Sequence, residues 1–328
     1  MDTKNVLEVK NLKTYFYTDE GVVKSVDGLD FNLGEGRTLA IVGESGCGKS
    51  VTSFSILRII QSPPGKIVDG EILFCGKDLL KLPESEMRKI RGDEISMIFQ
   101  EPMTSLNPVF TAGQQIVQTL LFHTDLTKQQ AREKAVEMIR VVGIPDAGRI
   151  ADQYPYQLSG GQRQRIMIAM ALACQPKILI ADEPTTALDV TIQAQILHLM
   201  VDMKKKFNTS MILITHDLGI VAQVADDVMV MYAGQAVECA PMRSLYKDPK
   251  HPYTSGLLKA LPKMSEKVDR LHTISGAVPS AANFPDGCRF AARCEFCKEI
   301  CKKKMPALYS LPDGRKVRCH LYAQGVRK

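Results

Sequence analysis

The stretch from Gly43 to Ser50, Gly-Glu-Ser-Gly-Cys-Gly-Lys-Ser, constrains the fold of this chain more than any other. It follows a continuous apolar run, Thr38 to Val42, and precedes a segment with helical spacing of apolar residues, Ser50 to Ile60. Buried strand, glycine-rich loop and helix, in this order, are the context that a phosphate-binding P-loop requires. The motif therefore predicts an α/β fold with the loop at the carboxyl end of a parallel strand.

The residues of the loop suit one chemistry, the binding of nucleotide phosphates. Glycines let backbone N–H groups wrap the phosphates, and the start of the following helix adds positive potential. Lys49 is expected to neutralise the β- and γ-phosphates of ATP, and the Ser50 hydroxyl to bind Mg²⁺. The predicted nucleotide contacts are Gly43, Ser45, Gly46, Cys47, Gly48, Lys49, Ser50 and Val51.

A second motif, Ile178-Leu-Ile-Ala-Asp182-Glu183, delivers two adjacent carboxylates at the end of an apolar strand. Asp182 is expected to hold Mg²⁺, which leaves Glu183 to polarise the attacking water as a general base. Simple capping of the strand is the alternative, but capping needs no pair of carboxylates beside a P-loop. His216 follows another apolar strand, Ser210 to Ile214, and is expected to reach the γ-phosphate.

Strands, then helices, then a distinct tail are predicted for the rest of the chain. Residues 6–42 alternate apolar and polar side chains between glycines, as half-exposed antiparallel strands do, and residues 66–80 have the pattern of another strand pair. Residues 112–142 have helical spacing. The last strand is expected near residues 228–232, and the prolines that follow it suggest a domain boundary near residue 240.

Composition separates the tail from the body. Residues 241–328 hold 18 Lys and Arg against 7 Asp and Glu, whereas residues 1–240 hold 24 against 29. The first residues lack a signal-peptide pattern, and no window approaches the ~18 uninterrupted apolar residues of a membrane helix. We therefore expect a soluble chain in a reducing compartment, with any membrane role supplied by partners. Nucleic acid is not an expected partner, because the basic tail lacks interleaved aromatic residues and a recognised motif.

The stretch Leu158-Ser-Gly-Gly-Gln162 is not part of the general P-loop enzyme pattern and narrows the class of protein further. A serine and two glycines directly before a helix, expected at about residues 163–173, form another anion-binding helix start. This stretch resembles the signature motif of ABC ATPases. The surrounding elements match that family in order: the P-loop, Gln100, the signature, Asp182-Glu183, the Ala187-Leu-Asp189 segment and His216.

The resemblance implies a P-loop NTPase (RecA-like) core with an antiparallel β subdomain and a helical subdomain at about residues 101–170. In the family, the signature of one subunit closes over the γ-phosphate held by the P-loop of another, so a dimer is implied. Gln100 would sense the nucleotide, bind Mg²⁺ together with Ser50 and Asp182, and couple the site to membrane subunits. The resemblance assigns further nucleotide contacts to Ser159, Gly160, Gly161, Gln162 and Asp189. An aromatic residue of the first strand would stack on adenine; alignment favours Phe16, with Tyr15 and Tyr17 close behind.

Residues 43–49, 97–108 and 251–254 narrow the resemblance to the ATPase subunits of dipeptide and oligopeptide importers, and residues 98–108 favour the D-type of two unlike subunits. The implied partners are an F-type ATPase subunit or a second copy of the chain, two transmembrane permease subunits and, indirectly, an extracellular peptide-binding protein. The chain would work at the cytoplasmic face of the membrane. Nickel and glutathione importers share this architecture. A soluble ABC ATPase outside transport is disfavoured by the single cassette and the absence of heptads.

Four cysteines, Cys288, Cys294, Cys301 and Cys319, match the pattern of this subfamily's C-terminal region, whereas Cys297 is extra. Four thiolates suit either a 4Fe-4S cluster or tetrahedral zinc, and the irregular gaps together with the resemblance favour the cluster. The basic residues around them either offset an anionic cluster or form a solvated basic face. The chain is thus predicted to consist of an ATPase domain, residues 1–240, and a small Cys-rich metal-binding domain, residues 241–328, which the metal would stabilise.

Overall fold

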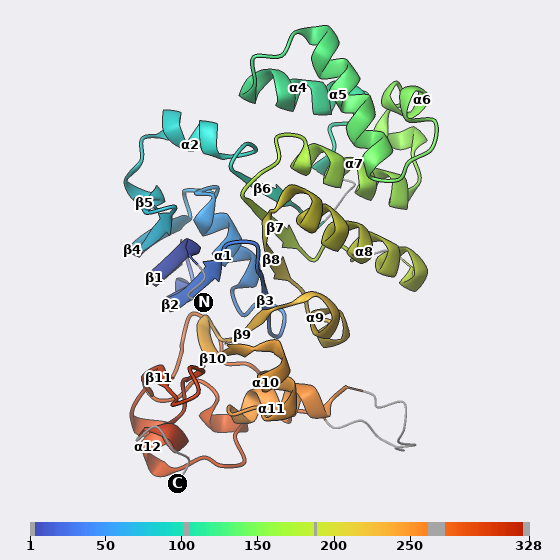
Figure 1. The fold of residues 1–328 in the computed structure, drawn as a ribbon. Coiled ribbons are helices and arrows are strands. Elements are labelled where there is room, and N and C mark those ends of the chain that lie inside the picture. Colours follow the sequence, from blue (N-terminus) through green and yellow to red (C-terminus); the bar gives the residue numbers. More distant parts are fainter. Residues whose placement is uncertain (1–3, 101–104, 187–188, 262–272, 324–328) are drawn as a thin grey trace. The chain divides into compact units, whose positions relative to one another are not determined.

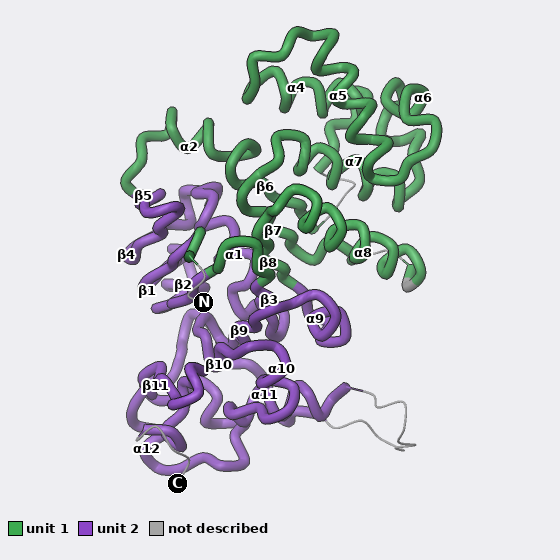
Figure 2. Tube along the Cα trace, in the orientation of Figure 1, with its two compact units in different colours: residues 1–6, 33–38, 81–214 green, residues 7–32, 39–80, 215–328 purple. Residues whose placement is uncertain are grey.

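The computed structural model describes residues 4–100, 105–186, 189–261 and 273–323. It contains two compact units that are interleaved in the sequence (Figure 2). Unit 1 comprises residues 1–6, 33–38 and 81–214, and unit 2 comprises residues 7–32, 39–80 and 215–328. Neither unit has a boundary at residue 240. The division into domains at residues 1–240 and 241–328 therefore stays a prediction.

Unit 1 contains a parallel sheet covered by helices (Figure 1). The strand order is β8-β7-β6, with β6 at Ile95–Ile98, β7 at Ile178–Asp182 and β8 at Ser210–Ile214. Every residue of β7 and β8 is buried, which explains why the sequences of both strands are continuous apolar runs. The strands predicted at these two places are confirmed.

The helices of unit 1 begin at recognisable caps. Residues 112–142, predicted to be helical, form two helices, and the Thr111 and Thr127 side chains cap them in identical capping boxes with Gln114 and Gln130. The helices are α2 (Glu84–Ile90), α4 (Ala112–His123), α5 (Lys128–Val141), α6 (Ala147–Ala151), α7 (Gly160–Leu172) and α8 (Val190–Phe207).

Unit 2 holds the antiparallel strands that alternation predicted near the N-terminus. They form a sheet of order β2-β1-β4-β5, in which β4 pairs antiparallel with both β1 and β5. The bounds are Asn5–Thr18 for β1, Gly21–Gly34 for β2, Gly65–Phe74 for β4 and Lys77–Asp78 for β5.

A second group of strands in unit 2 has the order β11-β12-β10-β9-β3. The strand expected near residues 228–232 is present as β9, but it is not the last strand, because β10 pairs antiparallel with β9 and with β12 of the tail. Ala233 and Gly234, with φ of 47° and 82°, form the two-residue turn before β10; alanine is a weak signal for such a turn. The bounds are Thr38–Val42 for β3, Asp227–Tyr232 for β9, Gln235–Pro241 for β10, Tyr309–Ser310 for β11 and Lys316–Val317 for β12.

In unit 2, helix α1 ends before the predicted Ile60, because Arg58 adopts a φ of 52°. Tyr232 of β9, Tyr253 of α11 and Phe290 of the tail pack in one buried core. The helices are α1 (Lys49–Ile56), α9 (Leu218–Val224), α10 (Met242–Lys247), α11 (Pro252–Lys259) and α12 (Glu299–Lys303). In the described ranges, no helix is both long and apolar enough to span a bilayer.

Candidate nucleotide-binding site

The predicted P-loop lies between β3 and α1 in unit 2, so the strand, loop and helix context is confirmed. Gly48 has a φ of 104°, and a Cβ atom there would lie 2.2 Å from the Ser25 carbonyl oxygen. Only glycine fits this position, because both the backbone conformation and the space exclude a side chain. Cys47 is 1% exposed, and burial raises its pKa, so its thiol is a core group rather than a reactive one.

Lys49 points back into the curve of the loop. Its side chain is buried, and Nζ donates hydrogen bonds to the carbonyl oxygens of Gly43 and Glu44 at 2.9 and 3.1 Å. Ser45 and Gly46 are exposed at the tip of the loop. An anion that enters the loop therefore meets an ammonium group that is already in place, together with the N-terminus of α1.

The three candidates for adenine stacking are neighbours on β1 and differ in their contacts. The Tyr15 hydroxyl donates a 2.7 Å hydrogen bond to Asp27, whereas Phe16 is half-buried and pairs with Gly65 of β4. Tyr17 is 52% exposed. Since the Tyr15 hydroxyl is engaged in unit 2, Phe16 and Tyr17 keep more freedom to meet a base, and Phe16 stays the prediction.

In unit 1, β7 carries the two predicted acidic residues to its carboxyl end. Asp182 is 2% exposed, and the N–H of Glu183 donates to the Ile214 carbonyl at 2.9 Å. The Glu183 carboxylate accepts hydrogen bonds from Gln100 and from Thr186, each at 3.0 Å. The predicted sensor and the predicted base are therefore in direct contact. The sequence alone did not predict Thr186 as a contact of Glu183. The sequence pattern that could have indicated it is a hydroxyl residue three positions after Glu183.

The signature stretch forms the start of α7. Ser159 is the N-cap: its Oγ accepts from the Gln162 N–H at 3.3 Å, and Gln162 Oε1 accepts from the Ser159 N–H at 3.0 Å. Ser159 and Gly160 are exposed, while Gly161 and Gln162 are partly buried. An exposed helix start with two glycines is open to an anion that approaches from outside the unit.

Of the two other predicted residues, Asp189 has a local structural role that the sequence did not specify. Asp189 caps α8 by accepting a 2.9 Å hydrogen bond from the Ile192 N–H. His216 is exposed and lies in unit 2, next to Thr215, whose N–H donates to the Ile41 carbonyl of β3 at 3.3 Å. Two parts of the predicted motifs, residues 101–104 and 187–188, lie outside the described residues.

Comparison with known proteins places these features in one family. Residues 26–186 match the family model described as ABC transporter, and residues 237–301 match that of the oligopeptide/dipeptide transporter C-terminal region. The chain is 54% identical to the oligopeptide transport ATP-binding protein AppD of Bacillus subtilis, over 97% of each chain. It is 51% identical to the dipeptide transport ATP-binding protein DppD of the same organism, over 98% of this chain and 96% of the relative. The chain belongs to the ABC transporter ATP-binding proteins of the oligopeptide/dipeptide family.

Solved ABC cassettes share the fold. The ATP-binding cassette MJ0796, solved as a dimer bound to ADP and phosphate, is 28% identical, with a TM-score of 0.65 over 72% of this chain and 99% of that one. CbiO1 of Clostridium perfringens, part of the ABC transporter complex cbiONQ, is also 28% identical, with a TM-score of 0.63 over 74% of this chain and 91% of that one. This chain is therefore an ABC ATPase with a P-loop α/β fold.

The C-terminal region of this ABC ATPase brings the four predicted cysteines to one place. Cys288, Cys294, Cys301 and Cys319 line a small cavity together with His251 and Phe290, and Cys297 is not among the lining residues. Burial raises the pKa of Cys288 to about 11 and that of Cys319 to about 12. Among the described residues, however, no three His, Cys, Asp or Glu side chains form the ligand shell of one metal ion. The predicted metal-binding domain is thus not confirmed.

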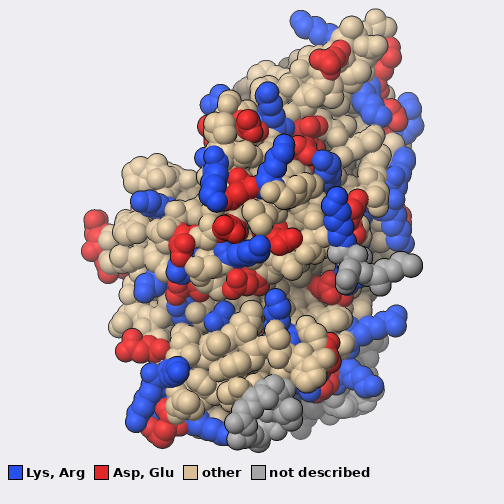
Figure 3. Space-filling model, turned by 60° about the vertical axis from the view of Figure 1, so that its left-hand side comes forward, with Lys and Arg blue, Asp and Glu red and all other residues tan. Residues whose placement is uncertain are grey.

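The sequence suggested two roles for the basic residues of the tail, to offset an anionic cluster or to form a solvated basic face. Their contacts in the structure match neither role completely. The Arg289, Arg293 and Arg318 side chains turn inward, where they donate to Asp27, to Glu44 and to backbone carbonyls including that of Ala236. Lys302, Lys303 and Lys304 are exposed. On the face shown in Figure 3, Lys and Arg side chains are interspersed with Asp and Glu. Part of the positive charge of the tail therefore stabilises unit 2 internally.

Proposed function

We propose that this chain is the ATP-hydrolysing subunit of an importer for dipeptides or oligopeptides. One observation carries the proposal: the similarity to peptide-transport ATP-binding proteins extends over 97% of the chain and includes both the cassette and the C-terminal region. A generic ABC ATPase would match in the cassette alone.

The roles of the individual residues follow from their chemistry. The backbone N–H groups of the loop, other than that of Glu44, would wrap the phosphates of ATP, with Lys49 as their counter-charge. Ser50, Asp182 and Gln100 would hold Mg²⁺, which shields the phosphate charge. Glu183, whose carboxylate is oriented by Gln100 and Thr186, would take a proton from the attacking water, and His216 would contact the γ-phosphate. That these groups serve one nucleotide is part of the proposal.

The exposed start of α7 supports a second subunit as the proposed partner. Ser159 to Gln162 would contact the γ-phosphate that a partner's P-loop holds, so two chains would form two sites. The partner would be an F-type ATPase subunit or a second copy of this chain. Two transmembrane permease subunits would anchor the pair to the cytoplasmic face of the membrane, and an extracellular binding protein would deliver the peptide to them.

Uptake by cells tests the proposal. Cells that lack this chain should lose uptake of labelled dipeptides and oligopeptides, the wild-type gene should restore it, and the Glu183→Gln gene should not. Nickel and glutathione uptake, measured in the same cells, are the controls for the alternative cargoes. Loss of nickel or glutathione uptake with normal peptide uptake would contradict the assignment.

We also propose that Cys288, Cys294, Cys301 and Cys319 hold a 4Fe-4S cluster. One observation supports a shared metal centre: the four cysteines line one cavity. Four thiolates are the usual ligand set of such a cluster. When bound, the cluster would cross-link a tail that buries little apolar surface of its own.

The absorption spectrum and metal content of anaerobically purified protein test this cluster. Wild type and Cys297→Ser, a matched variant outside the cavity, should both be brown and contain close to four irons per chain. Cys294→Ser should lose most of the iron. Colourless wild-type protein that contains one zinc per chain would exclude the cluster and leave the ATPase assignment unchanged.

A further inference from the structure

The second residue of the P-loop, Glu44, is held by residues that lie more than 200 positions later in the chain. Its carboxylate accepts two hydrogen bonds from Arg293, Nη1 to Oε2 at 3.0 Å and Nη2 to Oε1 at 3.1 Å. Its N–H donates to the Tyr253 hydroxyl at 3.0 Å. The paired contacts are the bidentate geometry in which a guanidinium binds a carboxylate most strongly.

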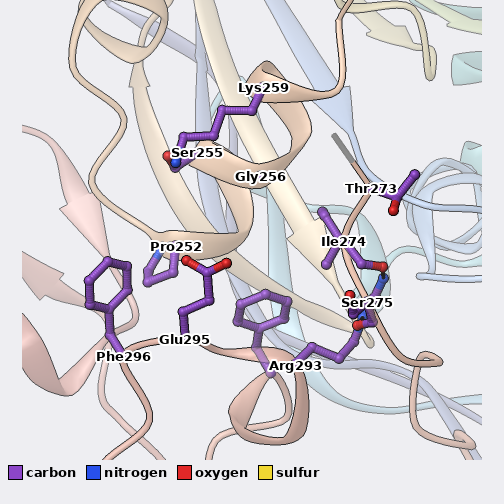
Figure 4. A pocket seen from close by; sticks show the side chains of 11 residues that line it. Pro252, Ser255, Gly256, Lys259, Thr273, Ile274, Ser275, Arg293, Glu295 and Phe296 are labelled. Atoms are coloured by element: carbon purple, nitrogen blue, oxygen red, sulfur yellow. Dashed lines mark hydrogen bonds between the residues drawn. The ribbon is translucent and has the colours of Figure 1, made fainter. Parts of the chain in front are cut away.

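Arg293 is fixed in this position by other contacts as well. Its side chain is 6% exposed, and Nε and Nη2 donate to the carbonyls of Ser275 and Ile274 at 3.0 and 3.1 Å. Figure 4 shows Arg293 reaching Ser275 and Ile274 along the wall of a pocket of about 440 Å³. Burial lowers the pKa of Arg293, but Glu44 and Tyr232 outweigh it, and the net pKa is raised. The guanidinium is therefore a fixed cation against which the loop is placed.

The residues that hold Glu44 adjoin the wall of the cysteine cavity. Arg293 directly precedes Cys294, and Phe290 lines the cavity while packing against Tyr232 and Tyr253 at ring distances of 5.2 and 5.4 Å. The cavity wall and both contacts to Glu44 thus belong to one packed group. A shift of this group would move the cation and the hydroxyl that hold the loop.

A carboxylate in a phosphate-binding loop has an unfavourable effect unless it is neutralised. Its negative charge repels the phosphates. Arg293 neutralises that charge by binding both carboxylate oxygens. We infer that Arg293 is a positioning residue through which the C-terminal tail sets the affinity of the P-loop for nucleotide phosphates. The inference rests on the proposed role of residues 43–50.

Titration of the full-length chain with a fluorescent ATP analogue and Mg²⁺ tests the inference. Arg293→Met keeps the length of the side chain but leaves the Glu44 carboxylate without its partner, so the affinity should fall about tenfold. Glu44→Gln removes the repulsive charge, so its affinity should stay within about twofold of wild type. The double variant Glu44→Gln/Arg293→Met should bind better than Arg293→Met alone.

The pattern across these variants separates charge positioning from simple structural support. A purely structural contact would be lost in Glu44→Gln and Arg293→Met alike, and equal losses of affinity would overturn the inference. Wild-type affinity in Arg293→Met would also overturn it. Should Arg293→Met not fold, Arg293→Lys replaces it: lysine lacks the planar fork, so about threefold weaker binding is expected, and unchanged binding contradicts the inference.

Two controls complete the design. Arg315→Met removes another buried arginine of the tail, whose carboxylate partners are Asp248 and Asp313, and should leave the affinity unchanged. Lys49→Ala should abolish binding. If Lys49→Ala binds like wild type, the P-loop assignment itself fails; if it loses the nucleotide while Arg293→Met binds like wild type, only the role of Arg293 fails.

Discussion

At the scale of single residues, Glu183 combines an unusual backbone with a fixed carboxylate. Its φ is 44°, a left-handed conformation that is uncommon for a residue other than glycine. Such strain persists where surrounding contacts impose it, and it is concentrated at functional sites. Here the contacts are the backbone hydrogen bond to Ile214 and the side-chain bonds from Gln100 and Thr186.

Glu183→Gln is expected to separate binding from hydrolysis. Glutamine preserves the size of the side chain but cannot accept a proton from water, so turnover should fall by a factor on the order of 10²–10⁴ while ATP still binds. Phosphate release by the assembled transporter and nucleotide binding by the chain are the two measurements. Normal phosphate release from this variant would show that another group is the base.

His251 gives the tail a second residue-scale property, a pH-dependent stability. It is 1% exposed, and its Nδ1 accepts the Tyr253 N–H at 3.1 Å as the cap of α11. Burial lowers its pKa from 6.5 to about 3. The folded chain therefore keeps His251 neutral, whereas the unfolded chain protonates it below about pH 6.5.

The stability supplied by this neutral histidine is complete above the unfolded pKa and is lost as the pH falls. Between pH 7.5 and 5.5 the free energy of unfolding should drop by about 1.4 kcal/mol on this account. His251→Asn keeps an acceptor for the α11 cap and removes the titration. Thermal unfolding of both proteins at pH 7.5 and 5.5 checks the effect: wild type should lose more stability than the variant, and equal losses would contradict the role of His251.

At the scale of elements, α5 and α7 begin with the same N-terminal capping box but are expected to have different functions. Both start with a capping box, Thr127 with Gln130 and Ser159 with Gln162, and in both the hydroxyl accepts at 3.3 Å. Capping accounts for the local stability of either helix. The two glycines that follow Ser159 distinguish α7, because they leave the helix start open to an approaching anion.

Ser159→Ala and Thr127→Ala therefore form a matched pair. Each should lower the free energy of unfolding by ~1 kcal/mol, because each helix loses its N-cap. Only Ser159→Ala should also reduce ATP turnover by the assembled transporter, and nucleotide binding by the isolated chain should be unaffected in both. The proposed role of the signature fails if the two variants hydrolyse ATP at the same rate.

At the scale of the whole molecule, the tail completes unit 2 rather than following it. β10 pairs with β12, and the Arg318 N–H donates to the Val237 carbonyl at 2.8 Å. Glu238 is fully buried, with its carboxylate bound by the N–H groups of Lys250 and His251. These bonds cross residue 240, where the sequence suggested a boundary.

Truncation after residue 240 should consequently destabilise the ATPase. It would expose the Tyr232 ring, which is 1% exposed in the full chain, and leave the Glu238 carboxylate without its donors. We expect residues 1–240 to aggregate or to unfold at a temperature at least several degrees lower than the full chain. The measurements are the solubility and the thermal unfolding of residues 1–240 and of the full chain. Identical melting temperatures would show that residues 1–240 fold independently.

The sequence by itself determined the P-loop, the acidic pair and the signature, because each is a local pattern whose spacing along the chain carries its chemistry. It also determined the buried strands β3, β7 and β8, whose apolar runs reflect burial on both faces. Tertiary structure alone decided the contacts of Gln100 with Glu183 and of Arg293 with Glu44, residues that lie 83 and 249 positions apart. A local pattern holds no information on which distant charge will neutralise a carboxylate; only the packing of the tail against β9 and the loop determines that.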